Sequence, residues 1–514
     1  MNAQVAQRGS AKRDSGNVLI LTMMVVFLVT TMSVGVLTVT SNTMFMTARQ
    51  RVASEAFNLA ESGAEMGALA LRLMSSAPTG LTPFDPLNGV QSLGDGTYSV
   101  TVYPDSGNSS NYLKTFRVIS TGTIGSQTRK VEIIVRQATF GRFAYYTDKE
   151  TSSVSGGAIW WKAGDICDGP AHSNNTSGSN FNINYVGSTA PIFRDILTAS
   201  GTSINYNPSH PADEPTFRKV YLDGSKGYRL GVPRIDLPAS TNAQQNAAWG
   251  AEVGQPSTAG VYLRSDSQGG IYVVGDAAIK LGVDGSGNQT IAVTQGTNVT
   301  TITANLAGNT TTSTGPVGTG SPASCSSAPN GVIYCTGNIT SMKGTVADNL
   351  YGGGTITKRS AWTIATDVNN NKDITITDNI RYNTRPNMLL SHDAEVNLAA
   401  GTLGLVARNV KIASSAPTSL EINAVCLAGG LNTTAGSFHV TNYDTKQPTG
   451  TLTVLGGIIQ KSRGPVGTFN PSTGQMTTGY AKNYSYDPRL ASDPPPFYPT
   501  TGTYERLSWR TLTQ

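Results

Sequence analysis

The residues that could carry out chemistry are few and scattered in this chain of 514 residues. Asp165, Asp168 and His172 are close enough in sequence to form a small polar site, but a cluster of this kind in a turn-rich segment more often caps a loop. None of the four histidines has the spacing of a metal site, and the motifs of serine hydrolases, nucleotide-binding proteins and zinc proteases are missing from the sequence. We therefore expect no enzymatic activity, no catalytic residue, no cofactor and no metal.

The four cysteines are Cys167, Cys325, Cys335 and Cys426, and no two of them form a CxxC motif. Their spacing argues against a zinc site and leaves two interpretations open. In the first, Cys325 and Cys335 flank a turn and form a disulfide, which leaves Cys167 to pair with Cys426. In the second, all four are buried thiols.

The N-terminal segment carries the strongest pattern. A basic leader, residues 1–16, ends at Gly16, and an apolar run without proline follows that is long enough to cross a bilayer. Apolar or small residues then recur every three or four positions up to Pro78. We expect one helix over 17–78, transmembrane in its first half and amphipathic in its second. The positive leader places it in the cytoplasm and everything after Ser41 outside.

A basic leader ending in glycine, an apolar half-helix and an amphipathic continuation together resemble the N-terminus of type IV pilins and pseudopilins. The segment AESGAEMGALAL resembles the PilX-like minor pilins in particular. The resemblance implies cleavage by a prepilin peptidase after Gly16 and methylation of the new N-terminal residue, Asn17. It also implies a single-pass protein of the inner membrane that later joins a pilus or the cell surface.

In that family the helix packs against other pilins or pseudopilins. The residues of this chain that we expect at the assembly contact are Leu21, Val52, Ala56, Leu59, Gly63, Met66 and Ala70.

Leu21 departs from the pattern of the family, because most pilins have a glutamate as the fifth mature residue. A carboxylate in a membrane is costly unless it is paired, and a subunit that starts or caps a fibre has no earlier neighbour to pair with it. Leu21 thus favours a minor, tip-proximal or priming subunit. The alternative is that Leu21 reports an ordinary anchor helix.

The rest of the chain has the composition of an all-β protein, with 56 glycines and only 13% charged residues. Residues 79–140 contain three alternating runs, GTYSVTVYP, KTFRVISTG and RKVEIIVR, which predict a pilin-like antiparallel sheet covered by the amphipathic helix. Residues 141–514 predict a glycine-rich ectodomain, similar to the modules that follow some PilX-like N-termini. We expect an irregular right-handed β-solenoid there, with a β-sandwich as the alternative.

Two segments of this ectodomain have a composition of their own. Residues 285–327 are rich in Thr, Gly, Asn and Ser, which predicts a weakly ordered surface loop. The C-terminal motif YSYDPRLASDPPPFYP contains Pro494, Pro495 and Pro496, which enforce an extended conformation. We interpret this motif as a strap over an exposed edge rather than a ligand groove.

The sequence thus favours a minor type IV pilin-like subunit that acts in pilus assembly or surface adhesion. A type II secretion pseudopilin is the alternative within this class. A membrane-tethered, glycan-active β-solenoid enzyme is the alternative from another class. The net charge of +5 is spread without a basic run, so nucleic acid is not indicated, and a surface ligand stays unidentified.

Overall fold

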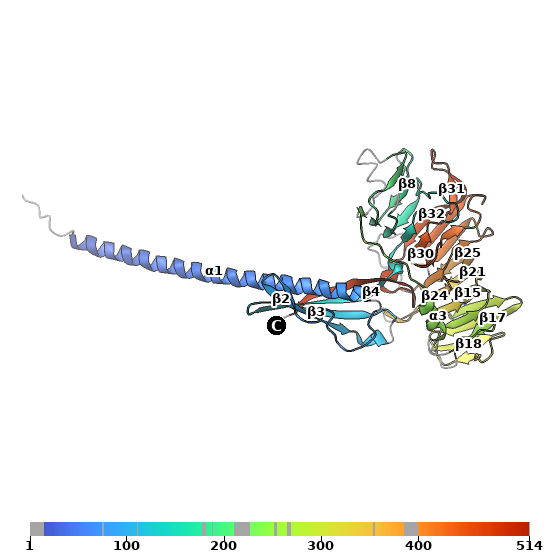
Figure 1. Cartoon of the computed structure of the whole chain (residues 1–514), viewed down its shortest axis with the longest axis horizontal. Helices are drawn as coiled ribbons and strands as arrows, with labels where there is room; N and C mark the ends of the chain where they lie inside the picture. Colours follow the sequence, from blue (N-terminus) through green and yellow to red (C-terminus); the bar gives the residue numbers. More distant parts are fainter. Residues whose placement is uncertain are drawn as a thin grey trace, which may run out of the picture. The chain divides into compact units, whose positions relative to one another are not determined.

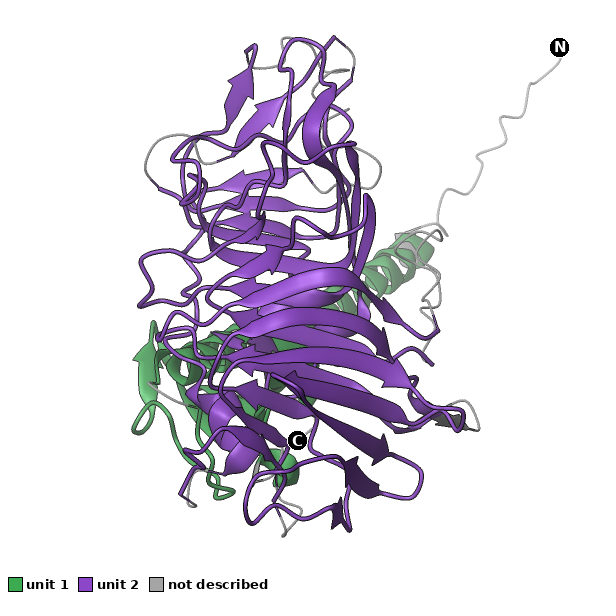
Figure 2. Ribbon diagram, turned by 90° about the vertical axis from the view of Figure 1, so that its right-hand side faces the viewer, with its two compact units in different colours: residues 1–136, 504–514 green, residues 137–503 purple. Residues whose placement is uncertain are grey.

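The computed structural model describes residues 15–74, 77–109, 112–176, 181–187, 189–209, 227–250, 254–264, 269–352, 355–384 and 399–512. The chain forms two compact units, which Figure 2 shows in different colours: residues 1–136 with 504–514, and residues 137–503. This differs from the predicted ectodomain of 141–514, because the last eleven residues belong to the first unit. The leader before Ser15 lies outside the described residues.

The first unit is a long helix on a five-stranded sheet. Helix α1 (Ser15–Leu73) packs its C-terminal half on strands β2 (Gly96–Pro104) and β3 (Thr115–Ile124) (Figure 1). The sheet order is β1 (Gln91–Leu93), β2, β3, β4 (Gln127–Thr139) and β33 (Thr500–Leu512). β1 pairs with β2, β2 with β3 and β3 with β4, and each of these pairs is antiparallel. A short 3-10 helix, η1 (Ser106–Ser109), lies between β2 and β3 in the chain. The predicted helix-on-sheet arrangement is confirmed.

Alternation along the strands explains the core of this unit. Val100 and Val102 on β2, Val118 on β3 and Ile133 on β4 are all buried in one cluster with the helix. Side chains alternate between the two faces of a strand, so one face of the sheet becomes apolar and must be covered. The amphipathic half of α1 provides that cover.

The fifth strand, β33, comes from the far end of the chain and adds to β4. Arg136 on β4 is paired with Glu505 at 2.5 Å, and Glu132 is paired with Arg510 at 2.6 Å. The two pairs run in opposite order along the two strands, as in an antiparallel pair. Glu132 is only 1% exposed, so its carboxylate depends for charge balance on Arg510 and on Arg117 of β3, which lies 3.3 Å away.

The second unit is a stack of coils joined by parallel strand pairs (Figure 2). The first line of stacked strands consists of β12 (Tyr228–Leu230), β10 (Leu197–Ala199), β7 (Ala171–Ser173), β5 (Tyr145–Lys149), β30 (Gly450–Ser462), β28 (Ser419–Ala428), β26 (Thr402–Ala407), β24 (Ala361–Thr366), β20 (Val332–Cys335) and β14 (Ile271–Val274). Parallel stacking of one coil on the next is the arrangement of a β-solenoid, whereas sandwiches are built from antiparallel sheets. The solenoid prediction agrees with this topology and the sandwich alternative does not.

A second line of parallel strands forms another side of the stack. It contains β9 (Ile192–Phe193), β6 (Ile166–Asp168), β32 (Met476–Tyr486), β30, β28, β29 (Phe438–Val440), β27 (Val410–Ile412), β25 (Ile374–Tyr382), β21 (Ile339–Val346) and β15 (Ala277–Val283). In chain order, β5, β7, β10 and β12 stack successively away from the position of β30. The strands from β14 to β28 then stack successively toward β30 from the other end. The incoming strand β5 and the late strand β30 therefore end up side by side.

The segment predicted to be a weakly ordered loop is instead folded. β16 (Gln289–Gln295), β17 (Asn298–Asn305) and β18 (Thr310–Thr314) form antiparallel pairs that continue from β15, and β18 pairs with β19 (Ser324–Cys325). Ile291, Val293 and Ile302 alternate with threonines and are buried. Threonine is a favoured strand residue, so a Thr-rich composition is compatible with an ordered sheet.

Smaller elements complete the described part of this unit. They are η2 (Phe140–Arg142), β8 (Asn182–Asn184), β11 (Asn205–Asn207), α3 (Asn242–Trp249), β13 (Gly260–Tyr262), β22 (Leu350–Gly352), β23 (Thr355–Lys358), β31 (Gly467–Phe469) and α4 (Arg489–Ser492).

One turn of successive coils is held by a ladder of side chains. The N–H of Asn338 donates to Asp276 Oδ1 at 2.7 Å, and the N–H of Asp373 donates to Asn338 Oδ1 at 3.0 Å. The N–H of Asn409 donates to Asp373 Oδ1 at 3.1 Å, and that of Ser437 donates to Asn409 Oδ1 at 3.1 Å. Each short polar side chain thus satisfies a backbone donor of the next coil, which buried backbone groups require.

The C-terminal motif is a strap, as predicted, but it covers a sheet face rather than an edge. Tyr498 is 1% exposed and lies against Gly404 of β26, where an added Cβ would come within 2.5 Å of the ring. Thr363 of β24 donates to Pro496 O at 2.5 Å. Tyr484 belongs to β32 and is buried in the interior of the stack, so it is not part of the strap.

The predicted disulfides are not formed, because all four cysteines are thiols. The Sγ of Cys325 lies 3.3 Å from Arg264 O, and that of Cys335 lies 3.2 Å from Gly275 O, so the two side chains meet different carbonyl groups. Cys167 and Cys426 are buried in the interior on different strands. The alternative interpretation, four thiols, describes the structure better, although Cys325 is only half-buried.

Candidate functional site: the exposed half of the long helix

Helix α1 has two halves with different surroundings. From Asn17 to Arg51 every residue is exposed, although most of them are apolar. No charged residue occurs between Asn17 and Ala48, a length of roughly 48 Å at about 1.5 Å per residue. The hydrocarbon core of a bilayer is about 30 Å thick, so this half is long and apolar enough to cross a membrane.

Eight hydroxyl groups on this half are satisfied within the helix itself. Thr22, Thr30 and Thr31 each donate to the carbonyl group four residues earlier at 2.8–2.9 Å. The same bond, at 2.7–2.8 Å, is made by Ser33, Thr38, Thr40, Thr43 and Thr47. A polar group without a partner is costly in hydrocarbon, so these back-bonds fit the helix to a lipid or a protein interior.

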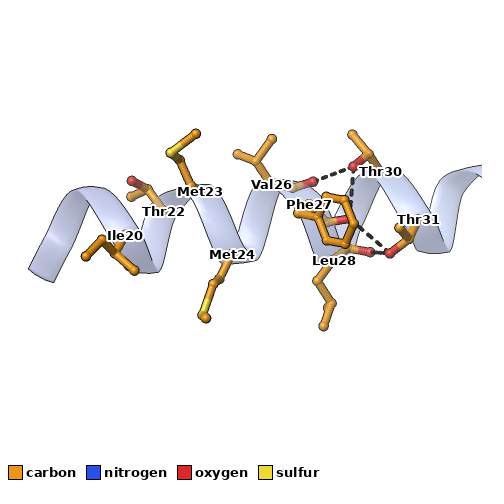
Figure 3. Close-up of a pocket in the computed structure, with 9 residues that line it drawn as sticks. All are labelled: Ile20, Thr22, Met23, Met24, Val26, Phe27, Leu28, Thr30 and Thr31. Atoms are coloured by element: carbon orange, nitrogen blue, oxygen red, sulfur yellow. Dashed lines mark hydrogen bonds between the residues drawn. The ribbon is translucent and has the colours of Figure 1, made fainter.

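Figure 3 shows the flank of this half between Ile20 and Thr31. The side chains of Met23, Met24 and Leu28 point away from the helix axis, and Thr30 and Thr31 bond back to the helix backbone. All residues that line this hollow belong to α1 alone. The hollow is therefore an open helix surface that suits another helix or lipid, not a closed ligand cavity.

The predicted processing and assembly residues at the start of α1 are Gly16, Asn17 and Leu21. Gly16 and Asn17 fall in the first turn of the helix, and Leu21 is 64% exposed. Because Leu21 carries no charge, the exposed surface of α1 from Asn17 to Ala48 is uncharged throughout. Its role in assembly stays a prediction.

The second half of α1 is fixed to its own sheet, which corrects part of the predicted assembly stripe. Ala56, Leu59 and Gly63 are buried against the sheet and cannot contact another subunit. Met66 is 41% exposed, while Val52 and Ala70 are half-buried. The residues buried against the sheet are Ala56, Leu59, Ala60, Gly63, Ala64, Gly67 and Leu71.

The reason is the difference between the two helical periods. The predicted stripe repeats strictly every seven residues, or 3.5 per turn, whereas a straight α-helix has 3.6 residues per turn. The mismatch rotates such a stripe by about 20° per heptad, so over the two to three heptads from Val52 to Met66 and Leu73 it leaves the sheet-facing side. Met66 and Leu73 consequently face outward, and Leu71 takes the inner position; Leu73 is 75% exposed.

Glycines allow α1 to approach the sheet closely. A Cβ added to Gly122 of β3 would lie 2.3 Å from Ala56 O and 2.4 Å from Ala60 N. A Cβ added to Gly67 of the helix would lie 2.7 Å from a methyl carbon of Val100. Real Cβ atoms do not come this close to such atoms, so only glycine fits at these two positions. The helix is held as a rigid arm of the sheet.

The structure does not bring Asp165, Asp168 and His172 together into one site. Asp165 pairs with Lys482 at 2.6 Å, and Asp168 pairs with Arg194 at 3.5 Å. The ring nitrogens of His172 lie 2.8 Å from Thr198 Oγ1 and 2.9 Å from Asn174 Oδ1, and burial lowers the pKa of this histidine. Among the described residues no group of His, Cys, Asp and Glu could hold a metal ion.

A cluster of charges lies around Trp161 that was not predicted from the sequence. Arg463 and Lys482 each lie near the Trp161 ring, at 5.2 Å and 5.3 Å from its centroid, and pair with Glu150 and Asp165. Its paired residues are 313 and 317 positions apart in the chain, so no local pattern marks them. The one sequence signal is that basic and aromatic residues, Arg463 after β30 and Lys482 and Tyr484 on β32, occur next to apolar strand residues.

No family model matches the chain, and no curated protein matches it. Among solved structures, the chain is similar to the competence-associated pilin ComZ from Thermus thermophilus, with 11% identity and a TM-score of 0.30. The match covers 90% of this chain and 97% of that one.

Proposed function

We propose that this chain is a type IV pilin-like subunit that acts as a minor component, near the tip of a filament or in priming its assembly. The observation that carries the proposal is the continuity of α1. One helix joins an exposed, uncharged half of membrane-spanning length to a half that is locked onto an antiparallel sheet. Such a helix can leave a membrane and pack among identical or related helices without refolding.

In this proposal the exposed half of α1 first anchors the chain in the inner membrane and later lies in the core of the fibre. A prepilin peptidase cuts after Gly16, and Asn17 becomes the methylated N-terminus. The outward residues Met66, Leu69 and Leu73 on the second half, which are 41%, 42% and 75% exposed, add to the contact with other pilins. An uncharged Leu21 suits a subunit that has no earlier neighbour.

The second unit is carried outside the membrane on this anchor. We propose no catalytic activity for it, and the separate partners of Asp165, Asp168 and His172 support this proposal. Its role in the proposal is to present a surface for adhesion at the filament. A type II secretion pseudopilin shares the same helix, and a secretion assay on a deletion strain separates the two: loss of pili supports the proposal, and loss of secretion alone contradicts it.

The direct test is the N-terminus of the mature protein. Mass spectrometry of the protein from membranes and from sheared filaments should find a chain that begins at methylated Asn17. Gly16→Val should leave the leader attached and remove the protein from filaments. Gly35→Val is the matched control, since Gly35 lies on the same helix with nothing within 4 Å of an added Cβ. An N-terminus at Met1 or beyond Thr40 in the filament fraction would contradict the proposal.

A further inference from the structure

The second unit contains a cavity whose lining includes no residue of α1 or of the C-terminal strap. Its volume is about 240 Å³, and it lies between the segment before β6 and the strands β31 and β32. The residues that matter most along its wall are Trp160, Lys162, Tyr443, Phe469, Tyr480 and Lys482. This volume is roughly eight times the 30 Å³ or so that one water takes in the liquid, so it can hold a single ring with its substituents.

Two lysines line this cavity with hydrogen-bonding capacity to spare. Lys482 Nζ donates to Asp165 Oδ2 at 2.6 Å and to Trp160 O at 3.0 Å. Lys162 Nζ donates to Ala163 O at 2.9 Å and lies 3.8 Å from Asp165 Oδ1. An ammonium group has three donors, so one donor remains on Lys482 and two remain on Lys162 for a group inside the cavity.

The charge in this region is not balanced by the protein. Asp165 is shared by Lys162 and Lys482, while Arg463, behind them, pairs with Glu150 at 2.9 Å. Three cations thus share two carboxylates in a region where the five side chains are at most 11% exposed. The pKa of Lys482 is lowered by burial first, against the pull of Asp165, and also by the neighbouring charges of Arg463 and Lys162. A buried charge that is incompletely paired is costly, and one negative charge in the cavity would offset it.

The remaining wall is aromatic and apolar, with a polar rim. Trp160, Tyr443 and Phe469 are half-buried, so part of each ring is available, and Thr468 adds a hydroxyl group. Small-molecule sites combine such apolar walls with a few polar groups that fix the orientation of the ligand. A ring with an apolar face and several hydroxyl groups matches both parts of this lining.

We propose that this cavity binds a sugar ring that carries a carboxylate, such as a hexuronic acid residue. The carboxylate lies between Lys162 and Lys482, and the ring lies along the aromatic wall. A carboxylate carries a single negative charge, which equals the excess of one positive charge in the cluster, whereas a phosphate monoester carries about −1.5 to −2 at neutral pH. The site lies wholly within the second unit and does not depend on filament assembly.

The test is a titration of the full-length protein in detergent micelles with galacturonic acid, followed by NMR. Galactose, acetate and inorganic phosphate supply the ring alone, the carboxylate alone and a different anion. We expect galacturonic acid to bind at least about tenfold more tightly than each of the three, which is the effect of one charge-assisted contact. Equal binding of galactose or of phosphate, or no binding of galacturonic acid, would overturn the proposal.

Two variants separate the roles of charge and wall. Lys162→Gln should lower the preference for galacturonic acid over galactose by about five- to tenfold, because the carboxylate keeps only Lys482 of its two charged partners. Phe469→Ala should weaken the binding of both galacturonic acid and galactose and leave the ratio of the two affinities unchanged. Lys280→Gln on β15 is the matched control, since Lys280 is exposed and outside the cavity. This variant should change neither the affinity for galacturonic acid nor the preference over galactose. A Lys162→Gln protein that keeps its melting temperature and the full preference would refute the assignment.

Discussion

The contact between α1 and its sheet leads to a sharp prediction at Gly122. An alanine at this position places its Cβ 2.3 Å from Ala56 O and 2.4 Å from Ala60 N, both of which are backbone atoms of the helix. A side chain could rotate away, but the helix backbone can only move as a body. To reach an ordinary contact of about 3.4 Å, α1 must lift from β3 by roughly 1 Å, which loosens the packing that surrounds it.

The expected loss follows from the cost of overpacking. Inserting a methyl group into a well-packed core costs typically about 1–3 kcal/mol, and we place Gly122→Ala at about 3 kcal/mol because the obstacle is backbone. A domain of about 150 residues loses roughly 2–4 °C of melting temperature per kcal/mol. The first unit should therefore melt about 6–12 °C lower than in the unchanged protein.

The assay is hydrogen exchange on the full-length protein in micelles, read at the amides of β2 and β3 as the temperature rises. Gly80→Ala is the matched control, since an added Cβ there has nothing within 4 Å. Exchange at β3 should accelerate in Gly122→Ala and stay unchanged in Gly80→Ala. If the two variants behave alike, the close approach of helix and sheet does not stabilise this unit, and the description of α1 as a rigid arm fails.

Three further predictions concern assembly, the coil ladder and the cysteines. Leu21→Glu should reduce filament number in cells by impairing initiation, counted by electron microscopy, and unchanged piliation would contradict the priming role. Asp373→Ala should destabilise the second unit by about 1–3 kcal/mol, because the N–H and Nδ2 of Asn409 lose their acceptor. Asp378→Ala, on the strand β25 that Asp373 directly precedes, should cost less, because Asp378 Oδ1 accepts only from its neighbour in sequence. Alkylation of the native protein at pH 8 without reductant should label Cys325 and spare Cys335, since burial raises the pKa of Cys335 to about 12; complete protection of Cys325 that reductant removes would indicate a disulfide.

The helix and the first sheet could be predicted from the sequence because their patterns are local. An uncharged run from Asn17 to Ala48 and three alternating strand segments need no information from distant residues. The face of α1 that meets the sheet could not be fixed in the same way. A small difference between 3.5 and 3.6 residues per turn decides whether Met66 or Gly67 is buried, and both fit the same sequence pattern.

The C-terminal strand could not be predicted, because β33 pairs with a strand more than 360 residues earlier. Its partner is chosen by the open edge of β4 and by complementary charges, for example Arg510 with Glu132. The charged cluster around Trp161 is unpredictable for the same reason. By contrast, the ladder from Asp276 to Ser437 leaves a local trace: each member directly precedes a short apolar strand, as in GNIT and RNVKI.

The residues between 285 and 327 show how composition can mislead. Threonine and glycine suggested disorder, but Thr-rich β17 alternates Ile302 and Ala304 inward, and a period of two is a stronger signal than composition. The cysteine pairing was open in the sequence for a different reason. A short separation between Cys325 and Cys335 says nothing about which way each side chain points.

The pairing of β4 with β33 has a consequence for how such a protein can vary. The chain leaves the first unit on one strand and returns on the adjacent one, as it would at an ordinary hairpin. In the topology of the first unit, the 367 residues from Gln137 to Thr503 take the place of the loop that would connect β4 to β33. Coils could be gained or lost within that loop over evolution while the arm and its five strands stayed the same.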